Sequence, residues 1–236
     1  MLRLDKFLCD VKAGSRSQVK GYLKQGLVKV NGETIKRPEY KVDEDKDVVS
    51  FQGKEITYRK YVYYMLNKPK GAVSATKDPM CLTVTELLKD TGYDDLFPVG
   101  RLDKDTEGLL LMTNDGSLAH NLLSPRKHVE KIYYARLARP LLEEKRKELE
   151  EGVDIGEGIL TLPAKVERIT ETSIHLTITE GKYHQVKRML QAVGNEVVYL
   201  KRIAMGGIFL DESLLSGEYR ELTEEERKAA AFKKYQ

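Results

Sequence analysis

The chain has 236 residues, of which 41% are hydrophobic and 33% are charged, and its formal net charge at pH 7 is +3. This composition indicates a folded globular protein and excludes a disordered or fibrous one. No apolar run approaches the roughly 20 residues that span a bilayer, no signal-peptide core is present, and two cysteines build no disulfide framework, so the sequence predicts a reduced, cytoplasmic protein.

The positive charge is concentrated at the front of the chain. Residues 1–41 contain ten Lys or Arg and four Asp or Glu, so this segment carries +6 and the remainder carries −3. Such a distribution is typical of a phosphate-binding module joined to a second domain.

The front module is predicted to contain two helices and a hairpin. The apolar spacing of residues 4–11 is that of an amphipathic helix. A second helix fits residues 15–26, where Ser15 or Ser17 can cap the start and Gly26 can end it. The stretch LVKVNGETI alternates around an Asn-Gly pair, which is a strong hairpin signal. An acidic turn at residues 42–49 then leads into another strand.

A basic row on the second helix is the candidate RNA-binding surface. Arg16, Lys20 and Lys24 are four residues apart and therefore share one face; such a row can also be an ordinary solvated surface. Few acids neutralise it, so we expect it to bind RNA, with Arg3 and Ser17 as further contacts. The pattern RLDKFL…SRSQVKGYLKQGLVKVNGETI resembles the S4 type of RNA-binding domain over about the first fifty residues.

The rest of the chain is predicted to be a second, larger domain of the α+β class. Residues 53–60 read as a short polar linker, which gives domains at 1–60 and 61–236. Strand-like segments are mixed irregularly with helices at 140–152 and 183–194. This irregular order favours a mixed, mainly antiparallel sheet over a doubly wound parallel one.

The stretch GRLDKDTEGLLLMTND, residues 100–115, permits three interpretations. The alternation of Asp103, Asp105 and Glu107 before a glycine matches the start of an EF-hand calcium loop. That loop requires a Glu where Asn114 stands, and the preceding FPVG does not permit the entering helix. The acids can also form a simple turn, or Asp103 can be a carboxylate placed for chemistry.

Several motifs occurring in order favour the chemical interpretation. FPVGRLD with GLLLMTNDG, LNKPKG, EKIYY and EGKYHQVKRML together resemble the pseudouridine synthases of the RsuA-type branch over essentially the whole chain. The resemblance implies that Asp103 is the essential aspartate, that Tyr133 stacks on the base, and that Lys187 is the cation beside Asp103.

The implied reaction detaches a uridine base from its ribose through nitrogen and reattaches it through carbon. Nothing is oxidised and nothing leaves, so no cofactor and no metal is expected. Arg101 and Arg188 are expected to contact RNA; for Arg101 the alternative is a salt bridge to Asp105. His184 is assigned to packing rather than to chemistry.

The expected substrate is ribosomal RNA, free or in an assembling particle. The stretch SPRKHVEKIYY resembles the small-subunit members, which favours 16S rRNA over 23S rRNA. Two other interpretations remain: a noncatalytic rRNA-binding assembly factor, and a carboxylate hydrolase, which would need a second acid facing Asp103 across the substrate.

Overall fold

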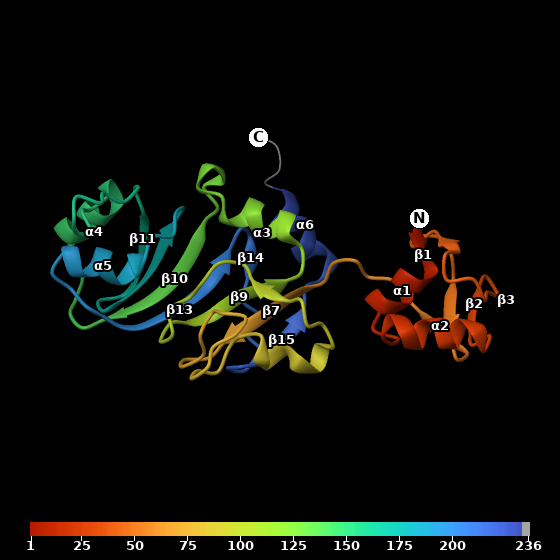
Figure 1. Ribbon diagram of the computed structural model, residues 1–236. Helices are drawn as coiled ribbons and strands as arrows, with labels where there is room; N and C mark the ends of the chain where they lie inside the picture. The colour runs from red at the N-terminus through yellow and green to blue at the C-terminus, as the bar shows by residue number, and fades with distance from the viewer. Residues whose placement is uncertain (233–236) are drawn as a thin grey trace. The chain divides into compact units, whose positions relative to one another are not determined.

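The computed structural model describes residues 1–232, and its internal contacts divide the chain after Tyr61 into two units (Figure 1). Each unit has its own hydrophobic core. Among the described residues, no helix combines the length and the apolar character that crossing a bilayer requires.

The first unit opens with helices α1 (Leu4–Asp10) and α2 (Arg16–Lys24). Ser15 caps α2: its hydroxyl accepts from the backbone N–H of Gln18, whose side chain accepts from the backbone N–H of Ser15. This reciprocal capping box satisfies two amide groups that the helix leaves unpaired. The inward faces of both helices supply Leu4, Phe7, Leu8, Val19 and Leu23 to the core.

The first unit also contains a sheet in the order β3-β2-β5-β6. Its strands are β2 (Val28–Val30), β3 (Glu33–Thr34), β5 (Val49–Phe51) and β6 (Lys54–Ile56), and a separate pair is β1 (Leu2–Arg3) with β4 (Lys41–Val42). The hairpin turn is confirmed, with positive φ at Asn31 (51°) and Gly32 (85°). The predicted linker is partly wrong, because β6 lies within it and the Tyr58 ring stacks on Phe7 at 5.1 Å.

The second unit is built on a mixed, mainly antiparallel sheet, as expected for the α+β class. The order along it is β11-β12-β10-β13-β9-β7-β15, with β14 beside β13 and β8 beside β9. Its strands are β7 (Tyr63–Lys68), β8 (Phe97–Pro98), β9 (Glu107–Thr113), β10 (Lys131–Leu137), β11 (Lys165–Thr170), β12 (Ser173–Ile178), β13 (Val197–Met205), β14 (Ile208–Phe209) and β15 (Tyr219–Glu221). The β9–β13 pair is parallel.

Helices cover both faces of this sheet (Figure 1). They are η1 (Glu86–Thr91), α3 (Gly116–Leu123), η2 (Pro125–Lys127), α4 (Glu143–Glu151), α5 (Gln185–Ala192) and α6 (Glu224–Phe232). Side chains alternate along β9, so Leu110 and Met112 join the core cluster that also contains buried residues of η1, α4 and α5. Leu109 and Leu111 join the cluster that contains buried residues of α3 and α6.

Two predicted helix ends can be compared with the structure. The helix after Pro140 begins only at Glu143, with Leu142 as its N-cap, so Pro140 precedes the helix instead of starting it. Helix α5 matches its prediction: Val186, Met189, Leu190 and Val193 are buried.

Strands β9 and β13 approach each other unusually closely at Gly108. A Cβ added there would lie 2.3 Å from the carbonyl oxygen of Arg202, and the φ of Gly108 is +96°. Both observations require glycine at this position. Strand β9 directly follows the loop that carries Asp103, and at Gly108 it packs against the backbone of β13.

Candidate active site

A cavity of about 500 Å³ opens beside the loop of residues 100–106. Its walls come from this loop, the end of α3, strand β10, the turn before α5 and strand β13. Three of the predicted site residues line it, Asp103, Tyr133 and Arg101, and Arg101 is exposed. The fold therefore brings together side chains from three distant parts of the sequence.

The loop that carries Asp103 is held by the segment LNKPKG. The Lys68 ammonium donates to the backbone carbonyls of Pro69 (3.0 Å), Lys104 (3.3 Å) and Thr106 (2.9 Å). On the other side, the Ser74 hydroxyl bonds to both backbone groups of Leu102, at 2.9 and 3.0 Å. Because backbone atoms on both sides of Asp103 are fixed, the carboxylate has a defined position.

Lys68 is a buried cation whose role the sequence did not reveal. Its side chain is fully covered, and burial lowers its pKa to about 8, although the acids of the neighbouring loop act in the opposite direction. Three carbonyl acceptors compensate part of the cost of burying an ammonium group. Its place in the motif LNKPKG is the only signal that pointed to it.

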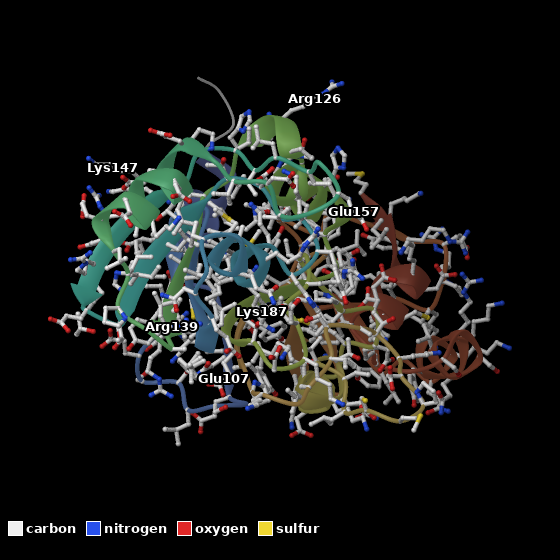
Figure 2. The ribbon with its side chains drawn as sticks, turned by 90° about the vertical axis from the view of Figure 1, so that its left-hand side faces the viewer. Glu107, Arg126, Arg139, Lys147, Glu157 and Lys187 are labelled. Atoms are coloured by element: carbon white, nitrogen blue, oxygen red, sulfur yellow. The ribbon has the colours of Figure 1, made fainter. Side chains whose placement is uncertain are left out.

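Lys187 reaches the same loop from α5. Its ammonium lies 3.2 Å from Oδ2 of Asp103 and donates to Oδ1 of Asp105 at 2.5 Å. Burial lowers the pKa of Lys187, but the bonds to Asp105 and Asp103 outweigh burial, and the net pKa is raised. The same bond holds the pKa of Asp105 below its ordinary value. Figure 2 labels Lys187 near the middle of the view.

The alternative partner proposed for Arg101 is therefore wrong, because Asp105 is paired with Lys187. Arg188, the next residue of α5, donates to the backbone carbonyls of Ile155 (2.8 Å) and Tyr183 (3.3 Å). These bonds tie Arg188 to the loop around Ile155, so its side chain has a structural role whether or not it also contacts RNA.

His184 lies at the site, although the sequence assigned it to packing. Its Nε2 is 3.6 Å from Oδ1 of Asp103, and its ring stacks on that of Tyr183 with centroids 3.8 Å apart. The residue has φ of 49°, a left-handed conformation that is uncommon outside glycine. The sequence offered one signal for this position: His184 lies three residues before Lys187, which is in the first turn of α5.

The three acids of the loop do not converge on one point. Asp103 and Asp105 face Lys187, whereas Glu107 accepts from the Tyr199 hydroxyl at 2.8 Å. Burial, followed by this carboxylate, raises the pKa of Tyr199 to about 12. Among residues 1–232, no cluster of three His, Cys, Asp or Glu side chains has the arrangement of a metal site.

In the first unit, the side chains of the basic row are exposed to solvent. Arg16, Lys20 and Lys24 are exposed along α2, as is Ser17, and the described part of the chain offers none of the three cations an ion pair. Arg3 differs, because it is paired with Asp5 through two bonds of 3.0 and 2.7 Å. The unpaired row is the stronger candidate for a phosphate-binding surface.

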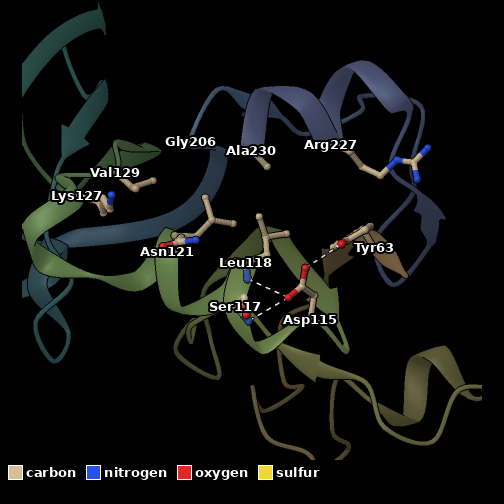
Figure 3. A pocket seen from close by; sticks show the side chains of 11 residues that line it. Tyr63, Asp115, Ser117, Leu118, Asn121, Lys127, Val129, Gly206, Arg227 and Ala230 are labelled. Atoms are coloured by element: carbon tan, nitrogen blue, oxygen red, sulfur yellow. Dashed lines mark hydrogen bonds between the residues drawn. The ribbon is translucent and has the colours of Figure 1, made fainter. Parts of the chain in front are cut away.

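A second cavity, of about 230 Å³, lies between α3 and α6 (Figure 3). Its one carboxylate, Asp115, is already used: it caps α3 through the N–H groups of Ser117 and Leu118 and accepts from the Tyr63 hydroxyl at 2.9 Å. The carboxylate of Asp115 therefore has a structural role.

The first unit displays a basic row of the kind that binds RNA. The second unit holds a carboxylate, paired with a cation, beside a cavity large enough for a base. Together these features define an RNA-modifying enzyme. Residues 62–192 match the family described as RNA pseudouridylate synthase, and residues 2–49 match the S4 domain. The chain belongs to the RNA pseudouridylate synthase family. It is an isomerase of the RsuA-type branch with an S4 domain at its front, as the sequence motifs implied.

Relatives match over nearly the full length of the chain. The RNA pseudouridine synthase YtzG of Bacillus subtilis is 52% identical over 231 residues, covering 95% of this chain and 96% of that protein. Ribosomal small subunit pseudouridine synthase A of Escherichia coli is 44% identical over 227 residues, covering 95% and 98%. A solved structure described as a pseudouridylate synthase is 40% identical, with a TM-score of 0.69 and coverage of 98% and 100%.

Proposed function

We propose that this protein converts a specific uridine of 16S ribosomal RNA into pseudouridine, and that Asp103 is the reacting carboxylate. The observation that carries the proposal is the Asp103–Lys187 pair at the edge of a cavity large enough for one base. The carboxylate is fixed by its loop, partly shielded from water and accompanied by a cation at ion-pair distance.

The reaction balances without any other reactant. The bond from C1′ to N1 of the uracil breaks, the base turns, and a bond from C1′ to C5 forms. C5 then loses a proton and N1 gains one. A carboxylate can serve this sequence as a nucleophile at the ribose or as a base toward C5.

Tyr133 and Lys187 are proposed to support Asp103. A uridine inside an RNA helix cannot reach the carboxylate, so the nucleotide must leave its stack and enter the cavity. Tyr133 lies in the cavity wall and is 8% exposed, and its ring is proposed to stack on the base. The Lys187 ammonium, 3.2 Å from Oδ2 of Asp103, is proposed to hold the carboxylate in position.

The substrate is proposed from the names of the relatives and from the charge of the front unit. Two of the relatives, from Vibrio cholerae and Escherichia coli, are named for the ribosomal small subunit. Residues 1–60 are proposed to deliver the RNA through Arg16, Lys20, Lys24 and Ser17, with Arg3 in a lesser role and Arg101 and Arg188 contacting the RNA near the cavity. Action on ribosomal RNA would place the protein in the cytoplasm.

Pseudouridine mapping tests the proposal. In cells that lack the protein, one 16S rRNA position should lose its pseudouridine, and expression of wild type should restore it. Asp103→Asn should not restore it, although its affinity for RNA should be kept. Asp105→Asn is the matched control and should restore it at least partly. Loss of a site in 23S rRNA instead would redirect the substrate, and restoration by Asp103→Asn would remove Asp103 from the chemistry and favour an assembly factor.

A further inference from the structure

We propose that Arg202 is a catalytic residue that donates a hydrogen bond to a carbonyl oxygen of the uracil and stabilises the negative charge on the base while it is detached from the ribose. This inference rests on the proposed function. It concerns the floor of the cavity, which lies on strand β13 beneath the Asp103 loop.

Arg202 is a buried cation with an unsatisfied hydrogen-bond donor. The residue is 2% exposed, and its Nε donates to the backbone carbonyl of Leu109 at 2.8 Å. Its Nη2 is buried and has no hydrogen-bond partner within the described chain. A buried charged N–H without an acceptor is costly, and buried donors are almost always satisfied. An acceptor supplied by a bound substrate would complete this site.

The strand register directs Arg202 toward the reacting base. Arg202 lies opposite Tyr133 on the neighbouring strand β10, so both side chains stand on the same face of the sheet. Both residues line the cavity, together with Asp103. A base that stacks on Tyr133 would therefore have its edge near the guanidinium group of Arg202.

A second buried cation lies on the same face. Lys131 is two residues before Tyr133 on β10, lines the cavity, is 9% exposed and donates to the carbonyl of Val129 at 3.0 Å. Burial, and then the charge of Arg202, lower its pKa to about 8, while Glu180 acts in the opposite direction. Within residues 1–232, neither Lys131 nor Arg202 has a carboxylate within ion-pair distance.

The charge of the cavity is therefore unbalanced. Lys187 lies between Asp103 and Asp105, and Glu180 in the cavity wall is paired with Lys182, whereas Arg202 and Lys131 on the floor have no such partner in the described chain. The remaining walls include the apolar side chains of Leu102, Val186 and Leu200, which suit a flat ring. A phosphate would have to give up its water to enter such walls, so the observations favour the base over the RNA backbone as the acceptor.

The chemistry requires such a donor. When the bond between C1′ and N1 breaks heterolytically, its electron pair stays on the uracil and spreads from N1 to O2 and O4. The charge disappears only when C5 bonds to C1′, C5 loses its proton and N1 gains one. A fixed cationic donor that faces O2 or O4 lowers the energy of the charged stage more than that of the neutral substrate.

Sulfur substitution in the substrate tests the contact. Short RNAs carrying uridine, 2-thiouridine or 4-thiouridine at the target position would be given to wild type and to Arg202→Gln in single-turnover reactions. Removing one such donor commonly slows the chemical step about 10²–10³-fold. We expect a loss of that size for Arg202→Gln with uridine, at unchanged RNA affinity. Sulfur is a weaker hydrogen-bond acceptor than oxygen, so wild type should convert one of the two thiouridine RNAs more slowly than the uridine RNA. Arg202→Gln has already lost the donor, so it should convert that thiouridine RNA as fast as the uridine RNA.

Controls separate this role from a structural one. Arg168→Gln removes an arginine of the same sheet that donates to the carbonyl of Leu141 outside the cavity, and it should keep the sulfur effect of wild type. Arg202→Lys should retain folding and part of the rate. Equal sulfur effects in wild type and in the Arg202 variants would overturn the proposal, as would a wild type that neither sulfur atom slows. Conversion of the unmodified RNA by wild type tests the proposed function separately.

Discussion

The ammonium group of Lys187 lies 3.2 Å from Oδ2 of Asp103, although the two residues belong to separate elements, helix α5 and the loop before β9. The buried apolar face of α5 fixes the helix against the sheet, and this leaves Lys187 directed at the loop. Lys187 also bonds Asp105, so one cation serves two carboxylates. The bond to Lys187 holds the pKa of Asp105 below its ordinary value.

Lys187→Met should shift the acidic limb of the pH–rate profile to higher pH. Without the cation, the bond that holds the pKa of Asp105 below its ordinary value is lost, so the loop should take up a proton at a higher pH and the rate should fall there. Lys187→Arg keeps the charge and should keep the profile. Lys182→Met, which removes a nearby cation paired with Glu180, is a second control. An unchanged profile for Lys187→Met would mean that the relevant cation is elsewhere.

Tyr133 should tolerate loss of its hydroxyl better than loss of its ring, if its role is stacking. Tyr133→Phe retains the ring, whereas Tyr133→Ala removes both ring and hydroxyl. Base stacking on an aromatic side chain contributes roughly 1–3 kcal/mol, so the Ala variant should lose about 5- to 160-fold in kcat/KM relative to Phe. Tyr134→Ala, at the adjacent position of β10, controls for damage to the strand. Wild-type activity of Tyr133→Ala would reduce Tyr133 to a core residue.

Lys68→Met should change how stability depends on pH. The folded pKa is about 8, below the ordinary value of 10.5, so between these pH values the unfolded chain binds a proton that the folded chain does not. The stability of wild type should therefore rise across this range relative to Lys68→Met, by up to roughly 3 kcal/mol. Urea unfolding at several pH values measures this difference. The exposed neighbour provides the control Lys70→Met, which should follow wild type.

Replacing Arg16, Lys20 and Lys24 together with Gln should weaken RNA binding mainly at low salt. Each phosphate contact contributes roughly −0.7 to −0.9 to the slope of log affinity against log salt, so the slope should flatten by about 2 units. Lys6→Gln with Lys46→Gln is the matched control, since Asp10 and Asp43 already pair these two cations. An unchanged slope in the triple variant would make the row an ordinary solvated surface.

Excess chelator should leave activity intact, because Lys187 and Tyr199 engage the loop acids that a metal would need. The assay uses a preformed RNA substrate whose folding in chelator is checked separately. A loss of turnover that a divalent ion restores would revive the calcium-loop interpretation of residues 103–114.

The sequence predicted local structure well where the structure of a segment depends mainly on residues within that segment. The hairpin at Asn31-Gly32 and the buried face of α5 follow from short-range patterns. The start of α4 was misplaced because a Pro before a helix marks its first turn only loosely. Strand β6 was missed because three residues with one partly buried side chain carry little periodicity.

The candidate site was predictable only as far as motifs reach. Asp103, Tyr133 and Lys187 could be named because each lies in a recognisable stretch. Lys68, His184 and Arg202 matter through pairings that sequence spacing does not contain: carbonyls from two loops, a left-handed turn before a helix, and a strand register. Burial of a cation such as Arg202 cannot be deduced from a lysine- and arginine-rich chain.

The contact at Gly108 limits how this enzyme can be redesigned. Because a single methyl group there would collide with the backbone of Arg202, any side chain at position 108 would shift the loop that carries Asp103 relative to the cavity floor. A library that varies the floor to accept a different nucleobase should hold this glycine constant. Conversely, a single substitution at Gly108 would separate the loop that carries Asp103 from the cavity floor on β13 while every side chain that lines the cavity is kept.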